Sequence, residues 1–391
     1  MSKICINRVA VVTETGIIEN GSVAFENGII TEVNHRSVAG GCDVAVDGAG
    51  LTAVPGYIDT HCHGGNGFDA NDATAESVEE IAAFYLRHGV TTIYPTLAAD
   101  DFDRLIECCD ATRKAMCRNA PGKADIRGAH LEGPFLNTLY KGSQPEEYFI
   151  RFDDRHLEAI EAHRDVIKRI TIAPETEGNM RRIAALRRLG IVVTGGHSDA
   201  TYEQTIMAAE QGMTGVTHLY NAMSGVHKDG PFRVCGMTEA GLTTDALYAE
   251  IIADGYHVPV PLMQTAYRCK GPDKLLVCSD ANSAAGKGDG TYRVYGHVFT
   301  VENGVAINAG RTSLAGSITA PDAMMRLLIT RAGIPAVDAA KMLALTPARM
   351  MGIDRRKGSI APGKVADINL LDREFRVMTT FAGGKDIRIP D

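Results

Sequence analysis

The spacing of hydrophobic and polar positions changes character twice along the chain. Between residues 9 and 33, short apolar runs are broken by turn residues, and Asn27-Gly28 stands between two of them, as a tight hairpin turn requires. From residue 55 onward apolar runs alternate with amphipathic stretches, and after about residue 357 the short β-like runs return. The pattern predicts two β-rich ends that flank a long region of alternating strands and helices.

One repeating unit shows how this central region is built. In the segment ESVEEIAAFYLRHG a single helical stripe precedes Gly89. The stripe consists of Val78, Ile81, Ala82, Tyr85 and Leu86. Residues 90–94 then have the apolar pattern of a buried strand, and the same order of helix, glycine and strand recurs over residues 180–197 and 205–219. Such alternation predicts parallel strands joined by crossover helices.

Eight strand candidates lie between the two ends. They are Tyr57–His63, Val90–Thr96, Ile126–Glu132, Ile170–Pro174, Ile191–His197, Val216–His218, Glu250–Asp254 and Leu275–Asp280. Eight parallel strands close a (β/α)₈ TIM-type barrel, which needs roughly 250 residues. We therefore predict an α/β fold with a barrel over residues 55–357. Residues 1–54 and 358–391 are expected to pair into one small β-domain.

Composition narrows the classes of function. The 391 residues include 40 Lys and Arg against 48 Asp and Glu, a formal charge of −8 that argues against binding nucleic acid or an anionic membrane. No apolar run approaches the ~20 residues of a membrane helix. Nine cysteines without a CxxC pair, and an N-terminus without a signal-peptide pattern, favour the cytoplasm. We expect a small-molecule partner.

Metal-capable side chains stand at the ends of the predicted strands. They are His61 and His63 on the first strand, Glu132 on the third, His197 on the fifth, His218 on the sixth and Asp280 on the eighth. In a barrel the carboxyl ends of the strands converge on one mouth, so these residues become neighbours there. The sequence thus predicts a site at that mouth.

The residue types point to a catalytic metal. A His-x-His pair on a strand places both imidazoles on one face and turns Cys62 toward the core. A single buried histidine is more often structural, but the joint placement favours a site for Zn²⁺ or Fe²⁺ with an open position for water. Asp280 could pass a proton from that water to a leaving nitrogen, or it could cap the following helix.

Several segments together resemble one known family. The segments are PGYIDTHCHG, HLEGPF, GGHSDAT, THLYNAM, IIADGYHV, VCSDA, SLAGS and GSIAPGKVADINLLD. In order and spacing, from about residue 9 to residue 372, they resemble the N-acetylglucosamine-6-phosphate deacetylases of the amidohydrolase superfamily. The resemblance implies a distorted (β/α)₈ barrel, a small β-sandwich from both termini and a homodimer. It also implies hydrolysis of an acetamido sugar to acetate and amine.

The resemblance also implies roles for individual residues. Glu132, His197 and His218 would hold the principal divalent metal, and His61 with His63 would allow a second one. Asp280 would act first as general base and then as general acid. The substrate would meet Asn221, Ala222, His257, Leu314, Ala315 and Gly316.

Two segments depart from the family pattern. Where the family usually has KGAHP this chain has KGSQP, so that Ser143 and Gln144 are the expected sugar contacts. Where the family has HHREPG, with an arginine for phosphate, residues 224–231 contain no arginine in register. Lys228 is the expected substitute, with Arg233 and His227 as further candidates.

The expected reaction is metal-dependent hydrolysis of N-acetyl-D-glucosamine 6-phosphate to D-glucosamine 6-phosphate and acetate, with one or two Zn²⁺ or Fe²⁺ ions per subunit. One alternative is a related amidohydrolase that acts on N-acetylgalactosamine 6-phosphate, an unphosphorylated amino sugar or an N-acyl amino acid. Another is a metal-binding scaffold without catalytic activity. Such a scaffold would be expected to have lost Asp280 or a metal ligand, and this sequence keeps them all.

Overall fold

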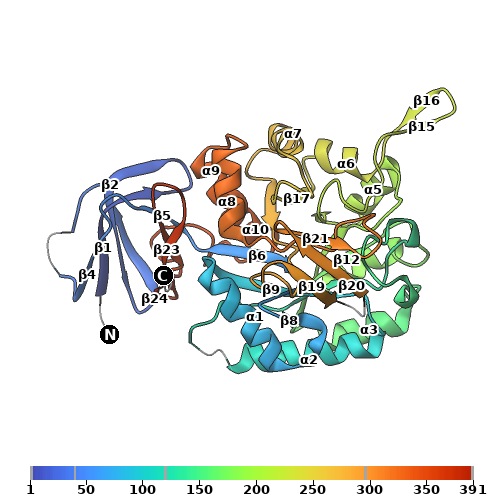
Figure 1. Ribbon diagram of the computed structural model, residues 1–391, viewed down its shortest axis with the longest axis horizontal. Helices are drawn as coiled ribbons and strands as arrows, with labels where there is room; N and C mark the ends of the chain where they lie inside the picture. Colours follow the sequence, from blue (N-terminus) through green and yellow to red (C-terminus); the bar gives the residue numbers. More distant parts are fainter. Residues whose placement is uncertain (1–2, 39–40, 119–120, 295–296, 389–391) are drawn as a thin grey trace.

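The computed structural model of the protein describes residues 3–38, 41–118, 121–294 and 297–388. Two parts lie side by side along the longest axis of the molecule (Figure 1). A β-sheet that contains strands from both ends of the chain forms one part, at the left of the view. A barrel surrounded by helices forms the other.

The sheet of terminal strands has the order β24-β23-β22-β5-β1-β2-β3, with β4 beside β1. The strands are β1 (Lys3–Val12), β2 (Ile17–Glu26), β3 (Ile29–Asn34), β4 (Val44–Asp47), β5 (Thr52–Pro55), β22 (Ile368–Leu371), β23 (Val377–Ala382) and β24 (Lys385–Arg388). Because β22 pairs antiparallel with β5, the two ends of the chain share one sheet, as the sequence predicted. The exact boundaries of the two domains stay a prediction.

Of two local features of this sheet, the sequence predicted one and gave no sign of the other. Asn27 and Gly28 both have positive φ, 53° and 76°, and form the tight turn predicted between β2 and β3. Cys5 and Cys42 form a disulfide that the sequence reasoning did not anticipate. Their separation of 37 residues gives no local spacing signal that would have revealed it.

The barrel strands are parallel. They are β6 (Tyr57–Cys62), β9 (Val90–Ala98), β11 (Ala129–Glu132), β12 (Ile167–Ile172), β13 (Val192–Gly195), β14 (Gly215–Val216), β17 (Tyr248–Ile252) and β18 (Leu275–Cys278), with the short β10 (Asp125–Ile126) on β9. Each overlaps one of the eight predicted strands, and the predicted barrel class is confirmed. The sheet is nearly closed: the Asp280 N–H donates to the His61 carbonyl at 2.9 Å, linking the last strand to the first.

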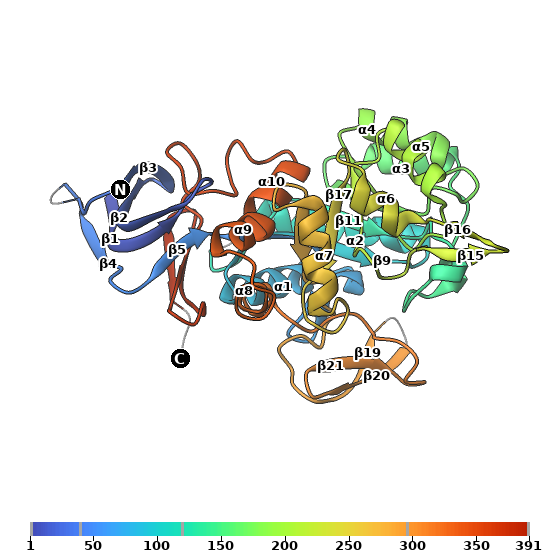
Figure 2. The same ribbon diagram turned by 90° about the horizontal axis from the view of Figure 1, so that it is seen from above.

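Helices cover the outside of the barrel, as Figures 1 and 2 show from two directions. They are α1 (Ala75–Arg87), α2 (Phe102–Arg118), α3 (Asp154–Ala162), α4 (Ile183–Arg188), α5 (Tyr202–Glu210), α6 (Met237–Thr243), α7 (Val260–Lys270), α8 (Pro321–Thr330), α9 (Ala336–Ala340) and α10 (Thr346–Met350). The predicted apolar stripe of α1 is wholly buried. Among the described residues, no helix is both long and apolar enough to cross a bilayer.

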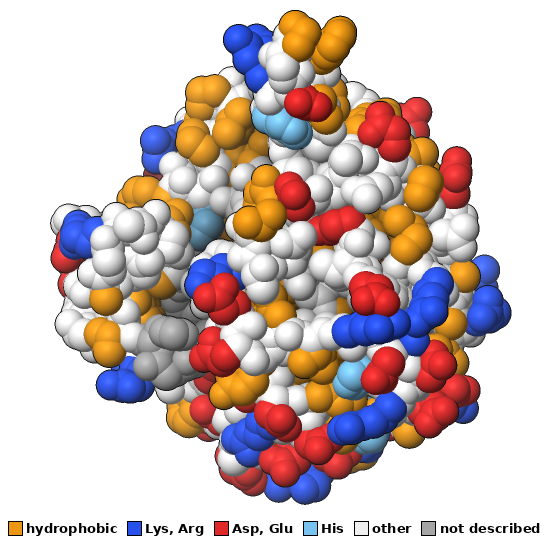
Figure 3. Space-filling model, turned by 90° about the vertical axis from the view of Figure 1, so that its right-hand side faces the viewer, with side chains coloured by type: hydrophobic (Ala, Val, Ile, Leu, Met, Phe, Trp, Pro, Cys, Tyr) orange, Lys and Arg blue, Asp and Glu red, His pale blue; other side chains and the backbone are white. Residues whose placement is uncertain are grey.

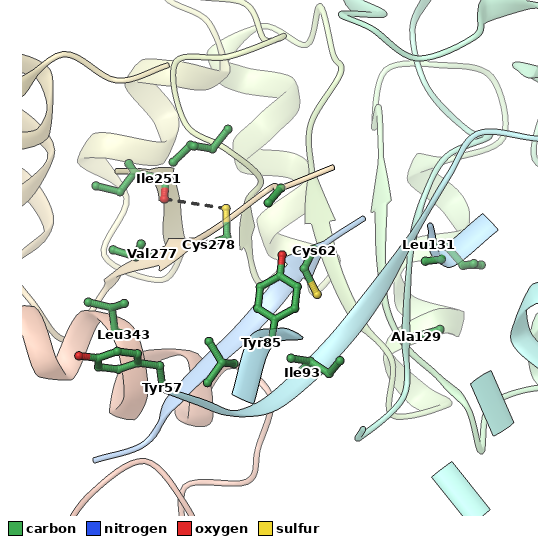
Figure 4. Close-up of a cluster of buried hydrophobic side chains, with 14 of the residues drawn as sticks. Tyr57, Cys62, Tyr85, Ile93, Ala129, Leu131, Ile251, Val277, Cys278 and Leu343 are labelled. Atoms are coloured by element: carbon green, nitrogen blue, oxygen red, sulfur yellow. Dashed lines mark hydrogen bonds between the residues drawn. The ribbon is translucent and has the colours of Figure 1, made fainter. Parts of the chain in front are cut away.

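The packing between α1 and the strands shows why the metal-capable residues of β6 face inward. Tyr85 of α1 lies beside Cys62 of β6 in the core between helix and sheet (Figure 4). Cys62 is fully buried there, as the alternation of β6 predicted. Because successive side chains alternate, His61 and His63 point to the opposite face, the interior of the barrel.

Two additions to the barrel were not predicted. One is a hairpin of β15 (His227–Asp229) and β16 (Phe232–Val234) that projects from the body of the molecule (Figures 1 and 2). The other is a small antiparallel sheet of β19 (Gly290–Val294), β20 (His297–Glu302) and β21 (Val305–Asn308). Asn303-Gly304, both at positive φ, is a hairpin signal that could have revealed the second addition.

Candidate metal centre and active site

The barrel brings the six predicted strand-end residues together. Their ligand atoms form two groups of three, each within 4.8 Å of one another: His61, His63 and Glu132 in one, and Glu132, His197 and His218 in the other. All five residues are buried. Glu132 belongs to both groups and therefore joins them into one cluster at the barrel mouth.

The Glu132 carboxylate contacts all four imidazoles. Oε1 lies 2.9 Å from His218 Nε2 and 3.3 Å from the Nε2 atoms of both His197 and His61. Oε2 lies 3.1 Å from His63 Nε2. Glu132 is therefore the residue that contacts the histidines of both groups.

The four imidazoles all present Nε2 to the cluster because Nδ1 is engaged elsewhere. The Nδ1 partners of His61, His63, His197 and His218 are Glu250 Oε1 at 3.0 Å, the Thr96 carbonyl at 3.1 Å, the Tyr140 carbonyl at 2.8 Å and the Asn221 carbonyl at 3.1 Å. Since these oxygens accept, each Nδ1 carries the hydrogen, and the Nε2 lone pair remains for a metal.

Asp280 completes the cluster from the end of β18. Its Oδ1 lies 3.2 Å from the Nε2 atoms of both His61 and His63. Asp280, His197 and His218 have φ angles of 46°, 46° and 33°, in the left-handed region that non-glycine residues rarely adopt. Such backbone strain persists where surrounding contacts hold a side chain in a required position.

The charges in the cluster shift the pKa values of its members in opposite directions. Burial opposes protonation of His63, but Asp280 and Glu132 raise its pKa to about 9. Burial likewise opposes protonation of His61, and the same two carboxylates hold its pKa well above the usual value. Burial disfavours ionised Glu132 and Asp280, yet the adjacent imidazoles keep both pKa values below their usual range. The cluster therefore has a strong preference for positive charge beside its carboxylates.

The donor set fits a divalent transition metal. Imidazole nitrogens and carboxylate oxygens are the ligands of catalytic Zn²⁺ and of non-haem Fe²⁺ sites. Each group offers three protein ligands. A catalytic metal ion takes at least four, so one or more coordination positions remain for water or substrate.

A buried ion pair that the sequence reasoning missed supports the cluster from beneath. Arg169 of β12 and Glu250 of β17 are fully buried, with Arg169 Nη2 3.1 Å from Glu250 Oε1. Arg169 also donates to Thr60, Thr194 and Thr217. Because Glu250 accepts from His61 Nδ1, the pair orients a metal-capable histidine. Glu250 at the start of one predicted strand, and Arg169 directly before another, were the available signal.

A cavity of about 540 Å³ opens above the cluster. Its lining includes Asp280 and the predicted substrate contacts Ser143, Gln144, Asn221, Ala222, His257, Leu314, Ala315 and Gly316. Val298 and Phe299 of β20 and Asn308 at the end of β21 add a wall that the sequence reasoning did not foresee. Lys228 is not among the lining residues, because it lies in the projecting hairpin.

Gln144 reaches the cluster itself. Its Nε2 donates to Glu132 Oε2 at 2.6 Å, and its Oε1 accepts from the Ala99 N–H at 2.8 Å. The backbone contact fixes which end of the amide faces the carboxylate. Gln144 thus contacts a candidate metal ligand as well as the cavity.

The comparisons with known proteins agree with this architecture. A family model described as "Amidohydrolase family" matches residues 52–387. The chain is a member of the amidohydrolase family. It is 32% identical over 374 residues to an N-acetylgalactosamine-6-phosphate deacetylase of Escherichia coli O157:H7, covering 95% of this chain and 96% of the relative. It is 31% identical over 384 residues to an N-acetylglucosamine-6-phosphate deacetylase of Bacillus subtilis, covering 97% and 96%.

Solved structures of similar amidohydrolases have the same overall shape. An N-acetylglucosamine-6-phosphate deacetylase from Pasteurella multocida superposes with a TM-score of 0.92 at 27% identity, covering 99% of this chain and all of the other. A variant of the Mycobacterium smegmatis enzyme, solved with N-acetyl-D-glucosamine-6-phosphate, superposes with a TM-score of 0.91 at 28% identity, covering 99% of each chain.

The projecting hairpin carries an exposed surface of basic and hydrophobic side chains. Lys228 and Arg233 are exposed and lie opposite each other in the β15–β16 register. Phe232 and Val226 are 72% and 58% exposed. Figure 3 shows basic, hydrophobic and histidine side chains gathered on the projection at the top of the view.

Proposed function

We propose that this amidohydrolase removes the acetyl group of N-acetyl-D-glucosamine 6-phosphate and releases D-glucosamine 6-phosphate and acetate. The observation that carries the proposal is the placement of Asp280 beside two joined groups of metal-capable residues at the base of a cavity. N-acetylgalactosamine 6-phosphate is the second candidate substrate, favoured by the name of the Escherichia coli relative.

Glu132, His197 and His218 would hold the principal divalent metal, and His61 and His63 would allow a second one. Zn²⁺ or Fe²⁺ suits this donor set. When bound, such an ion lowers the pKa of water and polarises the acetamide carbonyl.

Asp280 would move the proton that the reaction requires. As general base its carboxylate takes a proton from the attacking water, and as general acid it returns that proton to the departing nitrogen. The amide C–N bond breaks and the acetyl carbon keeps the new oxygen, so the products are acetate and an amine.

The cavity walls would hold the sugar. Asn221 and Ala222 would offer backbone groups to the substrate, while Leu314, Ala315 and Gly316 line the sugar pocket. His257 would contact the substrate; its Nδ1 lies 2.6 Å from Asp254 Oδ2, which fixes the ring. Ser143 and Gln144 would complete the polar wall.

The phosphate group requires positive charge, and the cavity of one chain offers little of it. Lys141 is the one Lys or Arg in the described lining, and its Nζ lies 2.8 Å from Glu146 Oε1. We propose a homodimer in which the hairpin of one protomer brings Lys228, with Arg233 beside it, to the cavity of its partner. The exposed Phe232 and Val226 would be buried in that contact.

We also propose a cytoplasmic location, where phosphorylated sugars are retained. The feature that counts against a reducing compartment is the Cys5–Cys42 disulfide. Thiol labelling of protein taken rapidly from cells tests the point, because free Cys5 and Cys42 are expected in the cytoplasm. A fully oxidised pair would contradict this location.

Acetate release tests the proposed reaction. The metal-loaded protein should deacetylate N-acetylglucosamine 6-phosphate, should lose activity on chelation, and should recover with Zn²⁺ or Fe²⁺. The unphosphorylated sugar and N-acetylgalactosamine 6-phosphate serve as matched comparisons. Equal kcat/KM with and without phosphate would contradict phosphate recognition, and no acetate from any of the three would contradict the deacetylase function.

A further inference from the structure

A second cleft lies at the opposite end of the barrel from the metal-capable cluster. Its volume is about 620 Å³. It is lined by Thr91 at the start of β9, by Asp125 of β10, by residues 352, 353 and 355–357, and by the turn between β23 and β24. Asp280, in contrast, follows the carboxyl end of β18. The second cleft is therefore separated from the first cavity by the length of the barrel strands.

The charge of this cleft is opposite to that of the whole chain. Six cationic side chains line it, namely Lys123, Arg127, Arg355, Arg356, Lys357 and Lys385. The acidic side chains among the lining residues are Asp125 and Asp367, which leaves an excess of four positive charges in a protein whose formal charge is −8. A local positive region of this kind concentrates small anions from solution.

A buried lysine engages both carboxylates of the cleft. Lys357 Nζ lies 2.8 Å from Asp367 Oδ2 and 3.1 Å from Asp125 Oδ2, and it also donates to Thr92 Oγ1 at 2.9 Å. Its side chain is only 10% exposed. Lys357 thus holds both acids. Asp125 Oδ2 also lies 4.0 Å from Arg127 Nε, and Lys123 pairs with Glu79, so these two cations are partly neutralised.

Three of the six cations remain available. Arg355, Arg356 and Lys385 are exposed, and none has a carboxylate partner among the side chains that the structure describes. The backbone beneath them is fixed: the Arg356 carbonyl accepts from the Val365 N–H at 2.8 Å, and the Arg356 N–H donates to Ile353 at 3.0 Å. Guanidinium groups on such a fixed turn present paired donors that match phosphate oxygens.

We propose that this cleft binds a small molecule that carries two or more phosphate groups. Its volume falls within the range of about 300–1,000 Å³ that is typical of small-ligand sites. A long polyanion such as nucleic acid would meet the acidic remainder of the surface and be repelled. Because Lys385 belongs to the sheet of terminal strands and Arg127 to the barrel, a bound polyanion would contact both parts of the molecule.

Calorimetric titration of the intact, metal-loaded protein with fructose 1,6-bisphosphate at low ionic strength tests the proposal. This probe carries two phosphates and no amide, so turnover does not interfere. Binding is expected in the wild type, and Arg355→Gln/Arg356→Gln should weaken it at least tenfold. The control Arg268→Gln/Arg326→Gln removes the same charge from exposed positions outside both cavities and should change the Kd by less than twofold.

Three results would overturn the proposal: absence of binding by the wild type, equal affinity in the Arg355/Arg356 variant, or an equal loss in the control variant. Binding that is lost on Lys141→Gln but kept in the arginine variant would assign the anion to the metal-site cavity and would also overturn it. If the double arginine variant fails to fold, Lys385→Gln from the opposite wall provides the same test, with an expected loss of several-fold.

Discussion

The interior of the barrel and the interior of the terminal sheet are both buried, but their chemistry is opposite. Beneath the metal-capable cluster, Arg169 and Glu250 form an ion pair surrounded by threonine hydroxyls. Barrel interiors are ordinarily filled by branched apolar side chains. The terminal sheet instead packs Phe25 against Phe381, with ring centroids 5.3 Å apart, among other wholly apolar residues.

The difference follows from what each interior must position. A buried ion pair is a poor source of stability, because removing two charges from water costs about as much as their attraction returns. It does, however, hold groups in one orientation, and here Glu250 holds the His61 imidazole at 3.0 Å. The interior of the terminal sheet holds no metal-capable cluster among the described residues, so apolar packing serves it best.

The largest expected effect comes from breaking the ion pair on one side. Arg169→Met leaves Glu250 buried without its cation and should lower the free energy of unfolding by about 3–5 kcal/mol. Denaturant unfolding measures this. The double variant Arg169→Met/Glu250→Gln should regain most of the loss, since it removes both charges. If Arg169→Met is as stable as the wild type, the buried Glu250 does not need Arg169 as its partner, and the ion pair does not organise the barrel interior.

Glu250→Gln leaves Arg169 buried without its anion and so destabilises the fold as well, but it should also weaken metal binding. The amide keeps a hydrogen-bond acceptor for His61 Nδ1 but loses the charge that strengthens this contact, so affinity of the His61–His63 site should fall about 10–100-fold. Metal content after competition with a chelator measures the effect. Glu19→Gln, at an exposed position of β2, is the control and should retain its metal. Equal metal content in both variants would show that Glu250 has no positioning role.

Gln144→Ala should have a smaller effect of the same kind. It removes the donor to Glu132 Oε2, a hydrogen bond to a charged group worth about 1.5–3 kcal/mol, and should weaken metal affinity by about tenfold or more. Competition with a chelator measures the role of Gln144 in metal binding, and steady-state kinetics measures its role in substrate binding. Unchanged metal affinity with a raised KM would show that Gln144 contacts the sugar and does not support the metal.

The smallest effect is expected in the apolar interior. Ile368→Val removes one methylene from the core of the terminal sheet and should cost about 0.5–1.5 kcal/mol of stability. Metal content and kcat should stay at their wild-type values. Lost activity at unchanged stability would show that the interior of the terminal sheet also affects the active site, which contradicts the difference drawn between the two interiors.

Sequence patterns were sufficient for the parts of the molecule that depend on local periodicity. Alternation of strands and helices predicted the barrel, and alternation within β6 predicted that Cys62 faces the core while His61 and His63 face the mouth. Because a barrel brings the carboxyl ends of its strands together at one mouth, the sequence also predicted that Glu132 and Asp280 lie close to these histidines.

Other features depend on contacts that no local pattern records. Arg169 and Glu250 are 81 positions apart and meet only because β12 and β17 face each other across the barrel. The family pattern suggested a sugar contact for Gln144, whereas its bond to Glu132 depends on the Ala99 backbone. The position of Lys228 depends on a hairpin that projects from the body of the molecule.

The central claim is that Asp280 performs proton transfer at a metal held by its neighbours. Measuring kcat and metal content of Asp280→Asn beside the wild type, with N-acetylglucosamine 6-phosphate as substrate, tests it most directly. The account predicts wild-type metal content and a kcat lowered by about 10²–10⁴-fold, the usual contribution of a general acid–base group. A variant that keeps both its metal and its activity would contradict the claim.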